Sequence, residues 1–197
     1  MKNKIYEILL KNGVGYEYDL ISYGFALIMR YILFFLILMI ISMLFNLVLE
    51  VFMLSVVFNI LRKYAGGFHF NDSYICYLFS FFSIILFSFF ISISDFHINQ
   101  IIIIDIIYLF TVILLSPQDC KNKRLTKSEK KYYSKVSLYI TLILSFFSIL
   151  FYSLYSLISR TIVIAFVFMT LNLLIAYCIN KHTIDWNFYE NFDFNVI

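Results

Sequence analysis

The sequence predicts an all-α, polytopic membrane protein with about six transmembrane helices and a short N-terminal amphipathic helix. Of the 197 residues, 62% are hydrophobic and only 14% are charged, whereas about half of the residues in a soluble domain are apolar. The mean hydropathy is +0.90. The chain has one proline and five glycines, which favours long helices. It does not show the alternating segments of about ten residues that mark a membrane β-barrel.

Residues 1–24 are predicted to form an interfacial amphipathic segment. Ile5, Ile8 and Leu9 recur at helical spacing among lysines, which is typical of a helix lying on the membrane surface. A solvated tail is the alternative. No apolar run with a small-residue cleavage site is present here, so we expect no cleaved signal peptide.

Spanning helices need about 20 mostly apolar residues. The segments that meet this requirement are 31–49, 74–94, 136–158 and 161–179. Segment 98–115 is shorter and carries Asp105. An ionisable residue within a span is a functional candidate by default, unless its position near the outer end lets it face water.

Segment 51–61 is too short to span the membrane alone, because charged residues bound it closely. One interpretation places the preceding turn near Asn46, so that Arg30 and Lys63 snorkel to the interfaces at the two ends. The other makes this segment re-entrant. The sequence leaves both open.

The distribution of basic residues favours six passes with both termini in the cytoplasm. In this topology all of the 15 lysines and arginines except Arg160 lie inside, as the positive-inside rule requires. Omitting the second pass would separate the basic loop from the basic N-terminus. We therefore predict a single domain over 1–197, with cytoplasmic loops at 62–73 and 116–135.

The cysteines do not suggest a disulfide framework. Cys76, Cys120 and Cys178 are odd in number and show no paired spacing. Cys120 and Cys178 are interpreted as packing residues. A metal site needs three or four ligands at recognisable intervals, which the sequence does not offer, so no metal is expected.

The polar passage 62–76, RKYAGGFHFNDSYIC, contains a candidate catalytic pair. His69 could take the proton of the Cys76 thiol, whose thiolate would attack a carbonyl. Cys76 is expected in the first turn of a helix, where the helix dipole favours an anion. A straight helix would separate the two side chains by about 10 Å, so the pair requires a bend within 71–73, where polar side chains compete for backbone hydrogen bonds.

Other residues of the passage could support this pair. Gly66 and Gly67 permit positive φ or a close backbone approach, and Arg62 could bind a carboxylate. The simpler interpretations are that Cys76 is a small packing residue and that Arg62 and Lys63 are cytoplasmic anchors.

The second polar loop, 116–135, adds an acid and many basic residues. Asp119 could orient His69 as the third member of a triad does. The basic residues, including Lys121, Lys123 and Arg124, would set topology and contact anionic lipid, or would dock an acidic peptide.

The spacing of Arg62, Gly66, Gly67, His69 and Cys76 in a membrane protein of this length resembles the accessory gene regulator protein B (AgrB) family. The similarity extends along the chain, through the basic amphipathic start to the second loop. There the family commonly shows Ala-Pro-x-Asp, and this sequence shows Ser-Pro-Gln-Asp over 116–119.

The resemblance implies a membrane cysteine endopeptidase of bacterial quorum sensing, in the cytoplasmic membrane with its site on the cytoplasmic side. It implies that Cys76 is the nucleophile and His69 the base, supported by Arg62, Gly66, Gly67 and Asp119. The implied substrate is an AgrD-like propeptide, which loses its acidic tail and is cyclised to a thiolactone or lactone. The resemblance implies no cofactor, no nucleic acid and a homodimer.

The competing interpretation is a non-enzymatic transporter or export scaffold for a small peptide. Transporters often have paired ionisable residues deep in several helices, together with internal repeats. Here the polar residues gather in loops and no repeat is found, which favours the enzyme.

Overall fold

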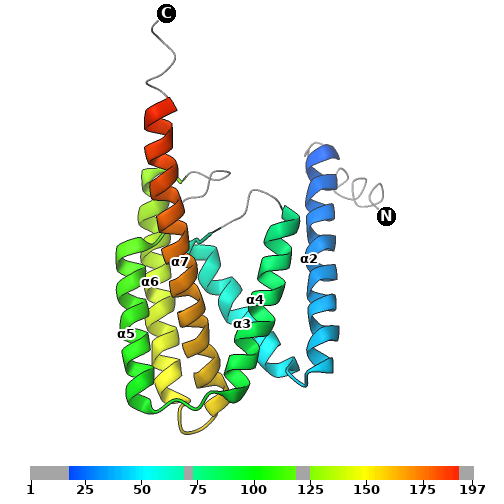
Figure 1. The fold of residues 1–197 in the computed structure, drawn as a ribbon, viewed down its shortest axis with the longest axis vertical. Helices are drawn as coiled ribbons and strands as arrows, with labels where there is room; N and C mark the ends of the chain where they lie inside the picture. The colour runs from blue at the N-terminus through cyan, green and yellow to red at the C-terminus, as the bar shows by residue number, and fades with distance from the viewer. Residues whose placement is uncertain (1–17, 69–72, 119–124, 191–197) are drawn as a thin grey trace, which may run out of the picture. The chain divides into compact units, whose positions relative to one another are not determined.

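The computed structural model describes residues 18–68, 73–118 and 125–190, with side chains described over 22–68, 74–118 and 125–180. Within these ranges all regular secondary structure is helical (Figure 1). The helices are α2 (Tyr18–Leu44), α3 (Val48–Ala65), α4 (Ser73–Ile93), α5 (Ile98–Leu115), α6 (Lys127–Leu150) and α7 (Ser156–Glu190). The chain divides into two compact units, Met1–Asn46 and Leu47–Ile197. The first contains α2 and the second contains α3 to α7.

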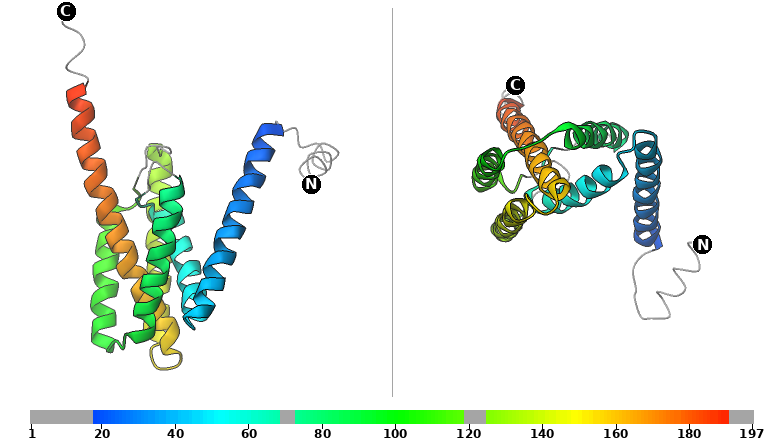
Figure 2. Two further views of the ribbon diagram at one scale, coloured as in Figure 1. Left: turned by 45° about the vertical axis from the view of Figure 1, so that its right-hand side comes forward. Right: turned by 90° about the horizontal axis from the view of Figure 1, so that it is seen from below.

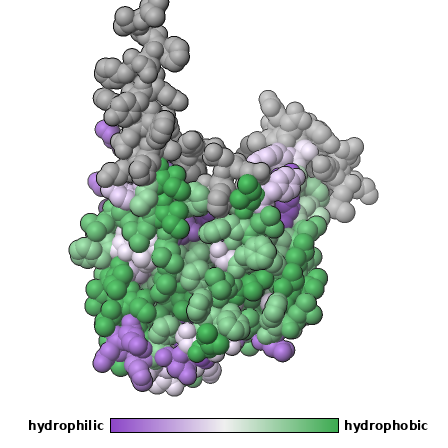
Figure 3. Space-filling model, viewed as in Figure 1, coloured by the Kyte–Doolittle hydropathy of each residue, from purple (hydrophilic) through white to green (hydrophobic). Residues whose placement is uncertain are grey.

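Five of the described helices are long and apolar enough to cross a membrane: Ser22–Leu44, Tyr74–Ile93, Ile98–Leu115, Lys127–Leu150 and Ser156–Asn180. On the face shown in Figure 3, hydrophobic side chains cover most of the helical wall and hydrophilic ones gather toward its ends. Such a surface is stable only against lipid. The prediction of an all-α, multi-pass membrane protein is confirmed.

Helix α3 contains the segment that the sequence left ambiguous. It is a continuous helix of 18 residues, about 27 Å long at 1.5 Å per residue. The turn before it contains Asn46 in the left-handed region (φ 54°), which is where one of the two interpretations placed it. Val51, Leu54, Phe58 and Leu61 are buried along one face, so α3 packs into the bundle.

Several predicted helix boundaries were wrong. Helix α2 ends at Leu44, whereas the first span was expected to reach 49, and α2 includes residues 18–24 of the segment predicted to be interfacial. Between α6 and α7 the chain turns at 151–155, earlier than expected. Arg160 therefore lies within α7, where it approaches Asp95 at 3.5 Å.

The two loops are also shorter than the sequence predicted. Helix α3 continues to Ala65, and α6 begins at Lys127 rather than at 136. The start of α6 is a capping box: Thr126 Oγ1 accepts from the Glu129 N–H at 3.3 Å, and Glu129 Oε2 accepts from the Thr126 N–H at 2.8 Å. This pairing satisfies two backbone donors that the helix start would otherwise leave without a partner.

Helix α7 forms the centre of the second unit, with α3, α4, α5 and α6 packed around it (Figure 2). In its spanning part 56% of the residues are buried, compared with 11–22% in the other four spans. Phe166 stacks on Tyr108 of α5 at 4.3 Å between ring centroids, and Phe168 stacks on Phe58 of α3 at the same distance. A polar side chain on α7 can therefore reach several neighbouring helices.

Candidate functional site

Cys76 lies in α4, four residues into a helix that begins at Ser73, and is half-buried. The prediction that it would occupy the first turn is confirmed. Cys76 therefore lies near the N-terminal end of α4. His69, Asn71 and the expected bend lie outside the described residues, so the contact between His69 and Cys76 stays a prediction.

Arg62, in the last turn of α3, turns back onto the loop that follows its own helix. Its Nη2 donates a hydrogen bond to the Phe68 carbonyl oxygen at 2.8 Å. The guanidinium carbon lies 5.6 Å from the centroid of the Phe58 ring, a distance at which a cation and an aromatic face attract. Arg62 therefore holds the backbone that leads to His69, which a simple membrane anchor would not do.

Gly66 marks the contact between the two polar loops. It adopts φ +76°, and a Cβ there would lie 2.5 Å from the Gln118 carbonyl oxygen. Next to it, the Gln118 N–H donates to the Ala65 carbonyl at 3.1 Å. The two loops thus meet backbone against backbone, and only a glycine fits there.

Gly67 is buried against α7. It adopts φ +147°, and a Cβ would lie 2.5 Å from Asn172 Oδ1. The same oxygen accepts a hydrogen bond from the Phe68 N–H at 2.8 Å. The close approach expected of the glycine pair is therefore present, at Gln118 for the first glycine and at Asn172 for the second.

The start of the second loop is fixed to three helices. Ser116 Oγ lies 3.0 Å from Ser137 Oγ of α6. Gln118 Nε2 donates to the Leu115 carbonyl at the end of α5 at 2.6 Å, and its Oε1 accepts from Asn180 Nδ2 of α7 at 3.2 Å. This anchoring places the chain immediately before Asp119.

Several predicted site residues lie outside the described residues, namely His69, Asp119, Lys121, Lys123 and Arg124. Their assigned roles stay predictions. Among the described side chains, no three of the His, Cys, Asp or Glu type gather closely enough to hold a metal ion.

Sequence reasoning missed Asn172 and Asn180, and it gave Gln118 no role. For Asn172 a signal was available: it is an amide within an otherwise apolar stretch of a predicted span. A polar side chain facing lipid or apolar neighbours is costly unless it has a partner. The partner itself, 104 positions away in the sequence, could not be read from the pattern.

Asp105 is not part of this site. It is buried, with 5% of its surface exposed, and its Oδ2 accepts a hydrogen bond from Ser148 Oγ of α6 at 2.6 Å. The Ser148 carbonyl in turn accepts from Ser159 Oγ of α7 at 2.7 Å. Asp105 faces the bundle rather than water, and it joins α5, α6 and α7.

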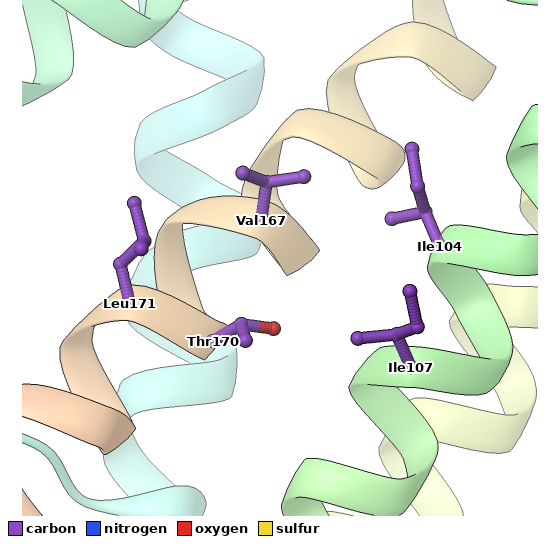
Figure 4. Close-up of a pocket in the computed structure, with 5 residues that line it drawn as sticks. All are labelled: Ile104, Ile107, Val167, Thr170 and Leu171. Carbon is purple, nitrogen blue, oxygen red and sulfur yellow. The ribbon is translucent and has the colours of Figure 1, made fainter.

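A small groove of about 160 Å³ lies between α5 and α7 (Figure 4). It is lined by Ile104, Ile107, Val167, Thr170 and Leu171. The Thr170 hydroxyl donates to the Phe166 carbonyl of its own helix at 2.8 Å. The groove therefore offers an apolar surface suited to lipid and no reactive group.

Comparison with known proteins places this sequence in a family. The sequence model of accessory gene regulator B matches residues 2–173. An AgrB-like protein of Clostridium perfringens (strain SM101) is 33% identical over 145 residues, which cover 70% of this chain and 68% of the relative. AgrB-like protein 2 of Clostridium perfringens (strain 13) is 31% identical over 145 residues, which again cover 70% of this chain and 68% of the relative. No solved structure matches the chain.

Proposed function

Because the chain belongs to the accessory gene regulator B family, we propose that it is a membrane cysteine endopeptidase that processes an AgrD-like propeptide. Family membership supports the processing of an autoinducer peptide. The observation that carries the peptidase chemistry is the position of Cys76, half-buried in the first turn of α4. Segment 66–68, which Arg62 and Asn172 hold through hydrogen bonds to Phe68, is joined to α4 by residues 69–72.

In the first step Cys76 acts as the nucleophile. Its thiolate attacks the peptide carbonyl at the end of the future signal, and His69 has taken the thiol proton. The carbon–nitrogen bond then breaks. His69 returns the proton to the departing amine, so that the C-terminal tail leaves with a free amino group and the signal remains on Cys76 as a thioester.

In the second step the thioester passes to the propeptide itself. A cysteine thiol or serine hydroxyl within the signal attacks the thioester carbonyl, forms the thiolactone or lactone, and releases the Cys76 thiol. Exchange between a thioester and a nearby thiol changes the free energy little. Water, which would hydrolyse the thioester, must therefore be kept out.

The supporting residues shape the site in this proposal. Arg62, Gly66 and Gly67 fix the loop that leads to His69. Asp119 orients His69, and the basic residues Lys121, Lys123 and Arg124 attract the acidic tail on the cytoplasmic side. The last two roles rest on charge complementarity alone.

Tail release in proteoliposomes tests the proposal. The substrate is a peptide with an amphipathic start, a central cysteine or serine and an acidic tail, to be sought among the short reading frames beside this chain's gene. The Cys76→Ala variant should lose tail release by at least about 100-fold. Cys178→Ala, which removes the exposed thiol of α7, is the matched control and should retain the wild-type rate. Equal cleavage by wild type and Cys76→Ala would mean that Cys76 is not the nucleophile.

A further inference from the structure

Asn172 is a buried amide in the central helix of the bundle, with 4% of its surface exposed. We propose that Asn172 is a positioning residue for the peptidase reaction: it fixes Phe68, and through Phe68 the start of His69, relative to α3 and α7, the two helices against which α4 packs. This inference rests on the proposed function. It adds to that function a residue to which neither the motif nor the comparisons assign a role.

Phe68 is held at both of its main-chain groups. Its N–H donates to Asn172 Oδ1 of α7 at 2.8 Å, and its carbonyl accepts from Arg62 Nη2 of α3 at 2.8 Å. Both distances are those of good hydrogen bonds. Two helices therefore fix the residue that immediately precedes His69 in the chain.

The peptide bond between Phe68 and His69 carries this constraint to the next residue. The carbonyl carbon of Phe68 is bonded to the nitrogen of His69 through a planar peptide, so fixing Phe68 restricts the starting point of the next residue. Catalysis depends strongly on such placement, since an error of about 1 Å can lower a rate by about 100-fold.

A glycine stands where the chain approaches Asn172 most closely. Gly67 has φ +147° and approaches Asn172 so closely that a Cβ would lie 2.5 Å from Oδ1. Glycine adopts this φ readily because it has no Cβ, whereas any other residue would collide with the Asn172 side chain. The contact with Asn172 accounts for the second glycine of the pair.

A merely structural amide would act differently from a positioning one. An Asn that only stabilises the bundle would, when replaced, lower the amount of folded protein and leave kcat per folded molecule unchanged. Replacing a positioning Asn lowers kcat and loosens segment 66–68, while the KM for the propeptide stays the same because the buried Asn172 side chain offers the substrate no surface.

The experiment compares three α7 variants in proteoliposomes. Asn172→Leu keeps the size and removes the acceptor, and Asn172→Asp keeps an acceptor oxygen. Thr170→Val is the matched control on the same helix, because its hydroxyl is bonded only within α7 and lines the apolar groove (Figure 4). The readouts are kcat and KM for release of the tail, together with amide hydrogen exchange of the peptide that contains Phe68.

We expect Asn172→Leu to lower kcat by about 10- to 100-fold with unchanged KM, and to speed exchange at the Phe68 amide. Asn172→Asp should recover most of the rate, and Thr170→Val should match wild type in every readout. If Asn172→Leu does not fold, Gly67→Ala displaces the same loop and should lower kcat in the same way.

The proposal is overturned if a folded Asn172→Leu or Gly67→Ala variant keeps the wild-type kcat while Cys76→Ala and His69→Ala are inactive. It is also overturned if kcat falls without faster exchange at Phe68. Failure of the proposed function itself is distinguishable, because it appears as wild-type tail release by Cys76→Ala. That result removes the positioning role together with the peptidase.

Discussion

At the scale of single residues, Gly66 is where the two polar loops are held together. We predict that Gly66→Ala lowers the free energy of unfolding by more than about 2 kcal/mol, because the left-handed φ and the Gln118 backbone both oppose a Cβ. Thermal denaturation of the purified protein in detergent measures this. Gly24→Ala is the control, since a Cβ there would meet nothing within 4 Å. Equal Tm values for the two variants would contradict the account.

The sequence could predict that this glycine pair permits a close approach, but not what approaches it. Gly66 meets a backbone from the second loop, and Gly67 meets an amide from the last helix. Both contacts depend on how α7 packs against α3 and α5. A local pattern of residues carries no information about that packing, so the sequence could not predict that Asn172 bonds to Phe68.

At the scale of helices, the pair of Asp105 and Ser148 ties α5 to α6 inside the bundle. We predict that Ser148→Ala lowers the free energy of unfolding by about 1–3 kcal/mol, because it leaves the buried Asp105 Oδ2 without its hydrogen-bond donor. Adding Asp105→Leu to Ser148→Ala should restore much of the loss, since no buried carboxylate then remains.

Detergent unfolding of the two single variants and the double variant measures this coupling. Thr111→Val on α5 is the control, because its hydroxyl is bonded to the Ile107 carbonyl of its own helix. A double variant whose loss equals the sum of the two single losses would show that Asp105 and Ser148 do not interact.

The sequence predicted the five long apolar helices, but it located the ends of only some of them. Apolar runs locate the lipid-facing parts of α4 and α5 to within a residue or two. They miss the start of α6, where Thr126 and Glu129 cap a turn that is rich in lysine. A hydropathy pattern locates only the part of a helix that contacts lipid. A helix can begin outside the lipid when its first turn is capped, as α6 does.

At the scale of the whole molecule, α3 to α7 run up and down, so their connections alternate between two ends (Figure 1). At one end of the helices, segment 66–68 contacts segment 116–118 through Gly66 and Gln118. At the other end, Asp95 pairs with Arg160. Sequence charge alone predicted that the two loops share a side of the membrane. The hydrogen bond from the Gln118 N–H to the Ala65 carbonyl oxygen supports that prediction.

This arrangement predicts opposite accessibility for two engineered cysteines. In a background without the native cysteines, the Asp95→Cys variant should react with a membrane-impermeant maleimide in intact cells. The Thr126→Cys variant should react only after the membrane is opened. Labelling of both from the same side would contradict the topology.

The central claim is that Cys76 forms an acyl-enzyme, and intact mass of the protein after incubation with the propeptide in liposomes tests it most directly. The account predicts an added mass equal to the propeptide without its tail, located on Cys76, together with free tail in solution. Cys76→Ala should show neither. Release of the tail by wild type without any adduct, or an adduct of the same mass on Cys76→Ala, would contradict the account.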